Sequence, residues 1–259
     1  MDKALPKTGL RRYSTCWHWI LLVINSIVIG GVFPVQAAVE RVKFATPSGY
    51  LLVEVLDDDL LHFELSPLVP GPLATQPLFT TPQVAKLDYN GPSSFQTSGP
   101  GGRVLETAEM SVQVDPATLC VMYTDKVRSA ALTTVCPWNL SQAVKGLTMT
   151  PGSMQHTYGL GEQFITPGSA DGDWTGRVRT PGDGFGNQMT GFGGGAAGNL
   201  QIPVMYALGA DNINYAVFLD HAYKQRWDFT VNPWRVETSG DQIRWYVMTG
   251  ANLPDLRRD

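Results

Sequence analysis

Residues 201–250, QIPVMYALGADNINYAVFLDHAYKQRWDFTVNPWRVETSGDQIRWYVMTG, decide the fold class. Short apolar segments alternate in this stretch with clusters of Asn, Asp, Gly and Pro, a spacing typical of antiparallel β-strands. In the last segment Ile243, Trp245 and Val247 fall on one face and the residues between them on the other, which predicts one core face and one wetter face. The predicted strands are Gln201–Leu208, Tyr215–Asp220, Gln225–Thr230, Trp234–Glu237 and Gln242–Met248.

The first half of the chain has the same organisation. Turn residues at 47–49 and 57–59 divide an opening meander, and Asp115-Pro116-Ala117 is typical of a hairpin. The evenly spaced short strands predict an all-β fold, a sandwich or barrel of antiparallel sheets. The strands expected here are Val39–Ala45, Tyr50–Leu56, Leu60–Leu65, Ser111–Val114 and Leu119–Tyr123.

The composition agrees with this fold class. Hydrophobic residues make up 43% of the chain, enough to bury a core, and 27 Gly and 18 Pro favour turns over long helices. Only 16% of residues are charged, and the formal net charge is -4. A nucleic-acid binder normally carries a basic face, so this class of partner is excluded.

Residues 1–37 are interpreted as a signal peptide. Residues 1–15 are basic, residues 17–32 are apolar, and Val35 and Ala37 lie at the -3 and -1 positions of a cleavage site after Ala37. The alternative is an uncleaved membrane anchor, for which the apolar run falls short of the ~20 residues that span a bilayer.

Residues 38–259 are therefore predicted as one exported domain, periplasmic or extracellular, without a membrane contact after cleavage. Cys120 and Cys136 remain in it as a pair, and an oxidising compartment permits a disulfide between them. Two buried thiols are the alternative. No further His or Cys lies at ligand spacing from this pair, so a metal site is not expected.

The Gly-rich loop, residues 166–199, interrupts the strand pattern. A long segment of this kind is usually functional or disordered, and its aromatic residues, Trp174, Phe185 and Phe192, offer flat faces that suit sugar rings. The alternative is a surface loop whose aromatic residues hold it to its own sandwich. The candidate sugar contacts are Asp171, Asp173, Trp174 and Asn187.

Four motifs in order resemble glycoside hydrolase family 31. They are YGLGEQ at 158–163, IPVMY at 202–206, YAVFLD at 215–220 and WYVMTG at 245–250. The resemblance implies a galactose-mutarotase-like β-sandwich that packs against a (β/α)₈ barrel. It also implies hydrolysis or transfer of α-linked glucose with retention in the full-length enzyme.

The same resemblance implies that this chain lacks the catalytic centre. The sequence ends at Asp259, where the barrel of the family would begin, and a barrel needs about 200 residues or more. Retaining glycosidases use two carboxylates about 5 Å apart, and the family's nucleophile lies in a barrel motif. Trp227-Asp228-Phe229 lacks that motif's context, so no catalytic residue is assigned and no cofactor is expected.

The expected function is that of the carbohydrate-binding, N-terminal domain of an exported family 31 α-glycosidase, inactive by itself. Its expected partners are an α-linked glucose oligosaccharide or polysaccharide and a (β/α)₈ barrel in cis or in trans. The alternatives are a stand-alone carbohydrate-binding module and a structural domain that docks on a separately encoded barrel.

Overall fold

A computed structural model describes most of the chain after residue 37. Residues 36–259 form one compact unit by their internal contacts. The predicted signal peptide lies outside the described residues, as does the proline-rich segment 67–82. Within the described residues, no helix is long and apolar enough to cross a membrane. The described ranges are 38–46, 49–66, 83–86, 88–161, 163–164, 172–179, 196–197, 202–221, 223–240 and 242–258.

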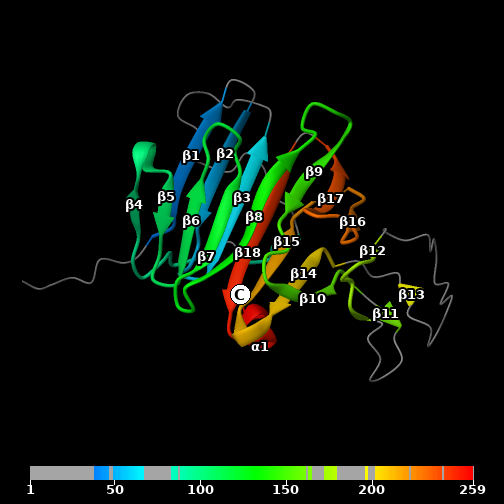
Figure 1. The fold of residues 1–259 in the computed structure, drawn as a ribbon. Coiled ribbons are helices and arrows are strands. Elements are labelled where there is room, and N and C mark those ends of the chain that lie inside the picture. The colour runs from blue at the N-terminus through cyan, green and yellow to red at the C-terminus, as the bar shows by residue number, and fades with distance from the viewer. Residues whose placement is uncertain are drawn as a thin grey trace, which may run out of the picture. The chain divides into compact units, whose positions relative to one another are not determined.

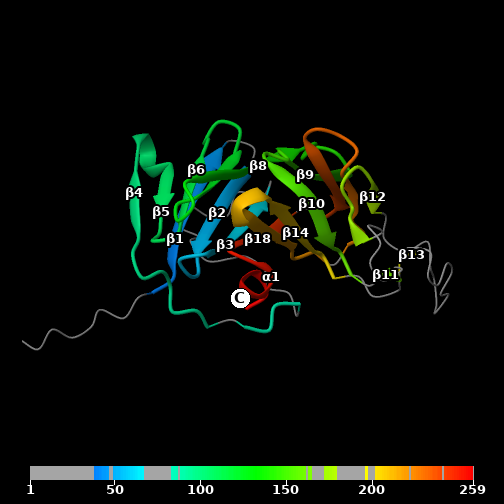
Figure 2. The same cartoon turned by 60° about the horizontal axis from the view of Figure 1, so that its bottom comes forward.

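The prediction of an all-β fold is confirmed. Two antiparallel sheets lie face to face as two layers, which Figure 2 shows from the side. The helix α1 (Leu253–Leu256) and the described residues 83–86 and 88–90 lie on the side of the smaller sheet that faces away from the larger one (Figure 2).

The smaller sheet has seven described strands in the order β1-β2-β3-β18-β15-β14-β10 (Figure 1). It joins the opening meander to the C-terminal segments through the pairing of β3 with β18. We call it the seven-stranded sheet. Its strands are β1 (Glu40–Thr46), β2 (Gly49–Val55), β3 (Leu60–Ser66), β10 (Met154–Gly159), β14 (Val204–Gly209), β15 (Asn214–Leu219) and β18 (Ile243–Gly250).

The larger sheet has nine described strands in the order β12-β16-β17-β9-β8-β7-β6-β5-β4. A separate pair, β11 (Gln163–Phe164) with β13 (Ala196–Ala197), lies outside both sheets. The strands of this nine-stranded sheet are β4 (Gln96–Ser98), β5 (Val104–Glu106), β6 (Met110–Val114), β7 (Val121–Asp125), β8 (Ala130–Trp138), β9 (Val144–Met149), β12 (Val178–Arg179), β16 (Arg226–Asp228) and β17 (Trp234–Ser239).

Aromatic residues in the interior join the two sheets. Trp245 of β18 stacks on Phe63 of β3 with ring centroids 5.2 Å apart, and its indole Nε1 donates a 3.0 Å hydrogen bond to the hydroxyl of Tyr123 in β7. All three side chains are fully buried. Ile243 and Val247 flank Trp245 in the same core, so the predicted core face of the last strand is confirmed.

The other face of the same strand differs from the prediction. Arg244 is buried and Tyr246 is half-buried, although both were expected on the wetter face. The reason is that a second apolar cluster covers this side of the sheet, with residues from β3, β14, β15 and α1.

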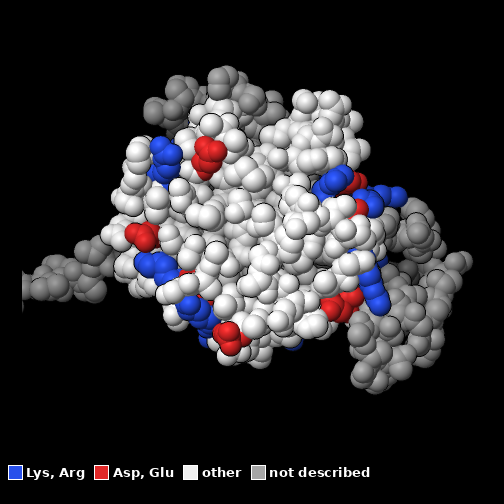
Figure 3. Space-filling model, in the orientation of Figure 1, with Lys and Arg blue, Asp and Glu red and all other residues white. Residues whose placement is uncertain are grey.

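The outer face of the nine-stranded sheet is the more open one. Figure 3 looks onto it and shows charged side chains along its margins and uncharged residues across its middle. The predicted hairpin at 115–117 joins β6 and β7 on this sheet. Cys120 and Cys136 lie at the start of β7 and in β8, and they form a disulfide, which selects one of the two sequence alternatives.

The YGLG part of the 158–163 motif ends strand β10 through its backbone conformation. Gly159 has φ +95°, and a Cβ built on it would lie 2.2 Å from the carbonyl oxygen of Val204 on β14. Leu160 follows with φ 64° and is buried, and Gly161 has φ 100°. Only glycine adopts such conformations without strain, so this motif ends β10 against its neighbour.

We predict that Gly159→Ala lowers the free energy of unfolding by at least about 2 kcal/mol, because the new methyl group meets the Val204 carbonyl at an already unfavourable φ. Gly176→Ala is the matched control, since Gly176 has φ +74° but no atom within 4 Å of a built Cβ. Urea denaturation measures both. Equal losses in the two variants would contradict the steric explanation.

We predict that removal of the disulfide destabilises the chain by about 3 kcal/mol, because the bridge closes a loop of 16 residues in the unfolded chain. For a domain of this size the melting temperature should fall by roughly 6–12 °C. Thermal denaturation of a Cys120→Ala, Cys136→Ala double variant measures the effect. A reducing agent should lower the melting temperature of the wild type alone, and a wild type insensitive to it would count against the prediction.

Candidate functional site

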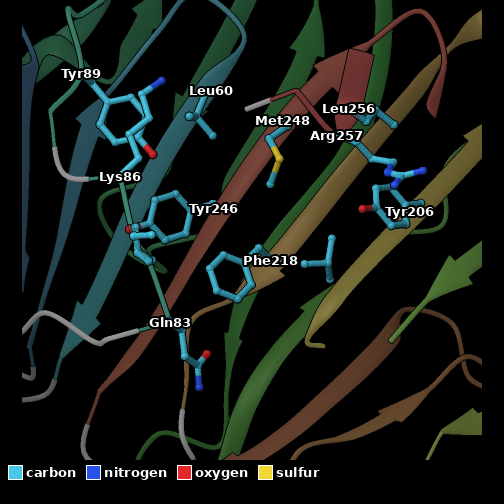
Figure 4. A pocket seen from close by; sticks show the side chains of 13 residues that line it. Leu60, Gln83, Lys86, Tyr89, Tyr206, Phe218, Tyr246, Met248, Leu256 and Arg257 are labelled. Atoms are coloured by element: carbon cyan, nitrogen blue, oxygen red, sulfur yellow. The ribbon is translucent and has the colours of Figure 1, made fainter. Parts of the chain in front are cut away.

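A pocket of about 400 Å³ lies on the outer face of the seven-stranded sheet. Strands β3, β14, β15 and β18 form its floor, while residues 83–86, Tyr89 and the end of α1 form its walls, and Figure 4 shows the side chains that line it. The lining residues are Leu60, Gln83, Val84, Ala85, Lys86, Tyr89, Val204, Tyr206, Phe218, Tyr246, Met248, Leu256 and Arg257.

Strand register brings the aromatic floor together. His62 on β3 pairs with Tyr246 on β18, and Tyr246 pairs with Phe218 on β15, so the three rings form one row across the sheet. The ring centroids of His62 and Tyr246 are 4.4 Å apart, and those of Tyr246 and Phe218 are 5.5 Å apart, both in stacked geometry. Two half-buried rings of this row, Tyr246 and Phe218, line the pocket.

The row continues behind the pocket as a polar cluster. Glu54 on β2 is buried; its Oε2 lies 2.7 Å from Nδ1 of His62, and its Oε1 accepts a 2.7 Å hydrogen bond from Nε of Arg41. Burial alone would raise the pKa of Glu54, but the hydrogen bonds and charges of His62 and Arg41 outweigh it, so the pKa lies below its usual range. Glu54 therefore stays ionised and fixes the ring of His62.

A second pair lies beside Tyr246. Arg244 is two residues earlier on the same face, with its Nε 3.6 Å from Oδ2 of Asp220. In the described part of the chain, two buried nitrogen atoms near the floor, Nε2 of His62 and Nη1 of Arg244, have no hydrogen-bond partner. Burial, followed by the negative charges of Asp220 and Glu54 and by the nearby Tyr89, raises the pKa of Tyr246, so its phenol stays neutral.

The turn between β2 and β3 holds the wall of the pocket in place. The carboxylate of Asp58 accepts hydrogen bonds from the backbone N–H groups of Ser93 and Ala108, at 3.1 and 3.2 Å. The N–H of Gly91 donates to the carbonyl of Leu56, also at 3.2 Å. The chain that covers the sheet is therefore attached beside the predicted turn 57–59, and the pocket has a fixed wall.

The second wall is the C-terminal helix. The side chain of Asn252 caps it by accepting a 3.0 Å hydrogen bond from the N–H of Asp255. Leu256 then packs into the outer cluster with Met248, and Arg257 reaches the pocket. On the opposite wall the ammonium group of Lys86 lies 4.4 Å from the centroid of the Tyr89 ring. The pocket thus combines stacked ring faces with cationic and amide donors at its rim.

Two of the sequence-predicted sugar contacts, Asp173 and Trp174, lie elsewhere, at the edge strand β10. Asp171 and Asn187 are outside the described residues. Trp174 is only 7% exposed and belongs to the core, with its Nε1 donating a 3.1 Å hydrogen bond to the carbonyl of Gly159. Arg179 lies over its ring at 5.5 Å. The prediction that Trp174 contacts sugar is untested. Its observed contacts attach residues 172–179 to strand β10, and we call Trp174 and its partners there the anchor.

Asp173 joins the same anchor. Its Oδ1 accepts hydrogen bonds from the N–H groups of Thr157 and Thr175, at 3.0 and 2.9 Å, and its Oδ2 lies 2.7 Å from Nδ1 of His156. Burial would raise the pKa of Asp173, but these hydrogen bonds lower it overall. The side chain of His156 is 52% exposed, so a sugar at this edge would meet the imidazole before the carboxylate.

Asp228 has structural partners. Its Oδ2 accepts a 2.9 Å hydrogen bond from Nη2 of Arg226, and its Oδ1 accepts from the hydroxyl and the N–H of Thr230. These bonds, the Thr230 hydroxyl first, lower the pKa of Asp228. Glu162, in the YGLGEQ motif, lies outside the described residues. Among the described residues, no group of three or more His, Cys, Asp or Glu side chains is placed to hold a metal ion.

The pocket was not predicted from the sequence. Its floor comes from strands far apart in the chain, and its wall includes residues next to the proline-rich segment. The one available signal was that Tyr206, Phe218 and Tyr246 are large aromatic residues at outward positions of predicted strands. Such positions are expected to be polar when the outer face of an antiparallel sheet meets water.

The sequence matches no family model and no curated protein. Solved structures do match. A glycoside hydrolase family 31 dextranase from Flavobacterium johnsoniae, solved in complex with isomaltotriose, has a TM-score of 0.60 and 14% identity over 85% of this chain and 27% of its own. A family 31 α-xylosidase from a soil metagenome, solved with xylose, has a TM-score of 0.55 and 11% identity over 82% of this chain and 32% of its own.

A cycloalternan-forming enzyme from Listeria monocytogenes, in complex with a pentasaccharide substrate, has a TM-score of 0.51 and 12% identity over 83% of this chain and 20% of its own. This chain thus spans about a third or less of the length of these enzymes. At such identities the likeness establishes the fold. The chain therefore has the β-sandwich fold that a part of these family 31 enzymes also has.

Proposed function

We propose that this chain is the carbohydrate-binding β-sandwich domain of an exported family 31 α-glycosidase. In this proposal it is a galactose-mutarotase-like N-terminal domain that binds α-linked glucose chains and acts with a (β/α)₈ barrel in cis or in trans. The observation that carries the proposal is the match of more than 80% of the chain to a part of a dextranase and of an α-xylosidase.

Two further observations support it. The four motifs of the resemblance fall on structurally important positions: YGLG ends β10, and the other three correspond to β14, β15 and β18, adjacent in the seven-stranded sheet. The disulfide between Cys120 and Cys136 agrees with export, because such bonds persist in oxidising compartments. The predicted sugar contacts, Asp171, Asp173, Trp174 and Asn187, remain part of the proposal.

The proposal assigns no catalysis to this chain alone. Retaining hydrolysis needs one carboxylate as nucleophile and a second as acid and base, about 5 Å apart. Asp228, in the Trp-Asp context nearest to the family's nucleophile motif, has its oxygens hydrogen-bonded to Arg226 and Thr230. Asp173 is held by two backbone N–H groups and His156. These are structural roles.

We predict that the purified chain releases no glucose from aryl α-glucosides or maltose, because the carboxylate pair is expected in a barrel, whereas the two large sheets of the described residues form a sandwich. Asp228→Asn is the control variant and should give the same background rate in a release assay. Turnover by the wild type that Asp228→Asn abolishes would contradict the proposal.

We predict that the chain binds isomaltotriose or maltotriose with detectable heat at millimolar ligand in isothermal titration calorimetry, since neutral sugars bind through ring stacking and hydrogen bonds. Cellotriose, with the same number of rings and β linkages, is the matched control and should bind more weakly. Absence of heat with both α-linked trisaccharides would remove the carbohydrate-binding part of the proposal.

A further inference from the structure

We infer that the pocket on the outer face of the seven-stranded sheet is a binding site for one neutral pyranose ring, whose apolar face stacks on Phe218 and Tyr246. This site is separate from the sugar contacts proposed at Asp173 and Trp174. The inference rests on the proposed function, and it names where in the described fold the sugar binds.

The floor of the pocket has the geometry that a sugar ring requires. Phe218 and Tyr246 are adjacent in register, and their rings lie within 20° of parallel with centroids 5.5 Å apart, so they offer two neighbouring aromatic rings to an occupant. Both are half-buried and both line the pocket, so their rings are held by the sheet while part of each stays accessible. The volume of about 400 Å³ is within the range of small-molecule sites.

The rim supplies polar groups on the side opposite to the floor. Gln83 and Lys86 have exposed side chains on one wall, and Arg257 lies on the other. These side chains donate hydrogen bonds, and the amide of Gln83 also accepts. An occupant with one apolar face and a periphery of hydroxyl groups satisfies both parts of the site.

A purely apolar occupant, such as a side chain of a partner protein, fits this site less well. It would desolvate the rim cations without replacing their hydrogen bonds, which is costly. A neutral sugar offers hydroxyl groups that hydrogen-bond to these cations.

The inference is tested on the ¹⁵N-labelled full chain by titration with methyl α-D-glucopyranoside and with isomaltotriose, followed by amide chemical shifts. We expect both ligands to shift amides of Phe218, Met248 and Arg257. Indole, titrated separately, probes an apolar occupant. The direct mapping on wild-type protein does not depend on whether any variant folds.

Variants then measure the contribution of the floor and rim. Phe218→Ala should weaken binding of methyl α-D-glucopyranoside roughly tenfold, the effect expected for loss of one stacking face. Leu208→Ala is the matched control, because Leu208 belongs to the same outer cluster but does not line the pocket, and it should bind as the wild type does. Gln83→Ala and Lys86→Ala, on exposed side chains, should each weaken binding severalfold while leaving the fold intact.

The outcomes are distinguishable. Shifts at the pocket together with weaker binding by the Phe218, Gln83 or Lys86 variants support the inference. If isomaltotriose binds but pocket amides do not move, the pocket inference is overturned and the proposed function stands. If indole shifts the pocket amides and neither sugar does, the pocket takes an apolar side chain and the inference is overturned. If no sugar binds anywhere, the carbohydrate-binding function fails with it.

Discussion

The contact of Trp245 with Phe63 and Tyr123 is the constraint on which the rest of the structure depends. It joins β18 and β3 of one sheet to β7 of the other, with a stacked ring pair and a hydrogen bond in the dry interior. Once these rings occupy the space between the sheets, the register of β18 is fixed, because a shift by one residue would place Arg244 or Tyr246 in the core. The outer face of the seven-stranded sheet follows from the same register.

That outer face is buried in an unusual way. Instead of meeting water, it carries the polar cluster of Arg41, Glu54 and His62 next to the aromatic row of Tyr246 and Phe218. Buried ion pairs contribute little net stability, because desolvation offsets their attraction. Here the ion pairs fix the position of a ring, because Glu54 holds the imidazole of His62 and that ring stacks on Tyr246. The polar cluster thus orients the floor of the pocket.

The strands could be predicted where apolar residues alternate between turn signals. The opening meander, the 110–125 hairpin and the C-terminal strands agree with the structure to within a few residues. In contrast, β8 (AALTTVCPW) and β9 (VKGLTM) mix small, polar and apolar residues and were missed. The pocket could not be predicted, because it depends on which strands become neighbours. The role of Trp174 could not be predicted either. A tryptophan in a loop suggests a side chain that stacks on a sugar ring, but only the fold shows that this one is buried against β10.

Asp173 and Trp174 attach the described residues 172–179 to the edge strand β10. Both residues bind the backbone of β10, at Thr157 and Gly159, and Arg179 donates a 3.4 Å hydrogen bond to the carbonyl of Leu160. These contacts follow β10 from Thr157 to Leu160, the residue after its end. The positive φ values of Gly159 and Gly161 end β10 at this same point. Asp173 and Trp174 thus have a structural reason to be there, while Tyr246 and Phe218, on the outer face of the seven-stranded sheet, line the pocket.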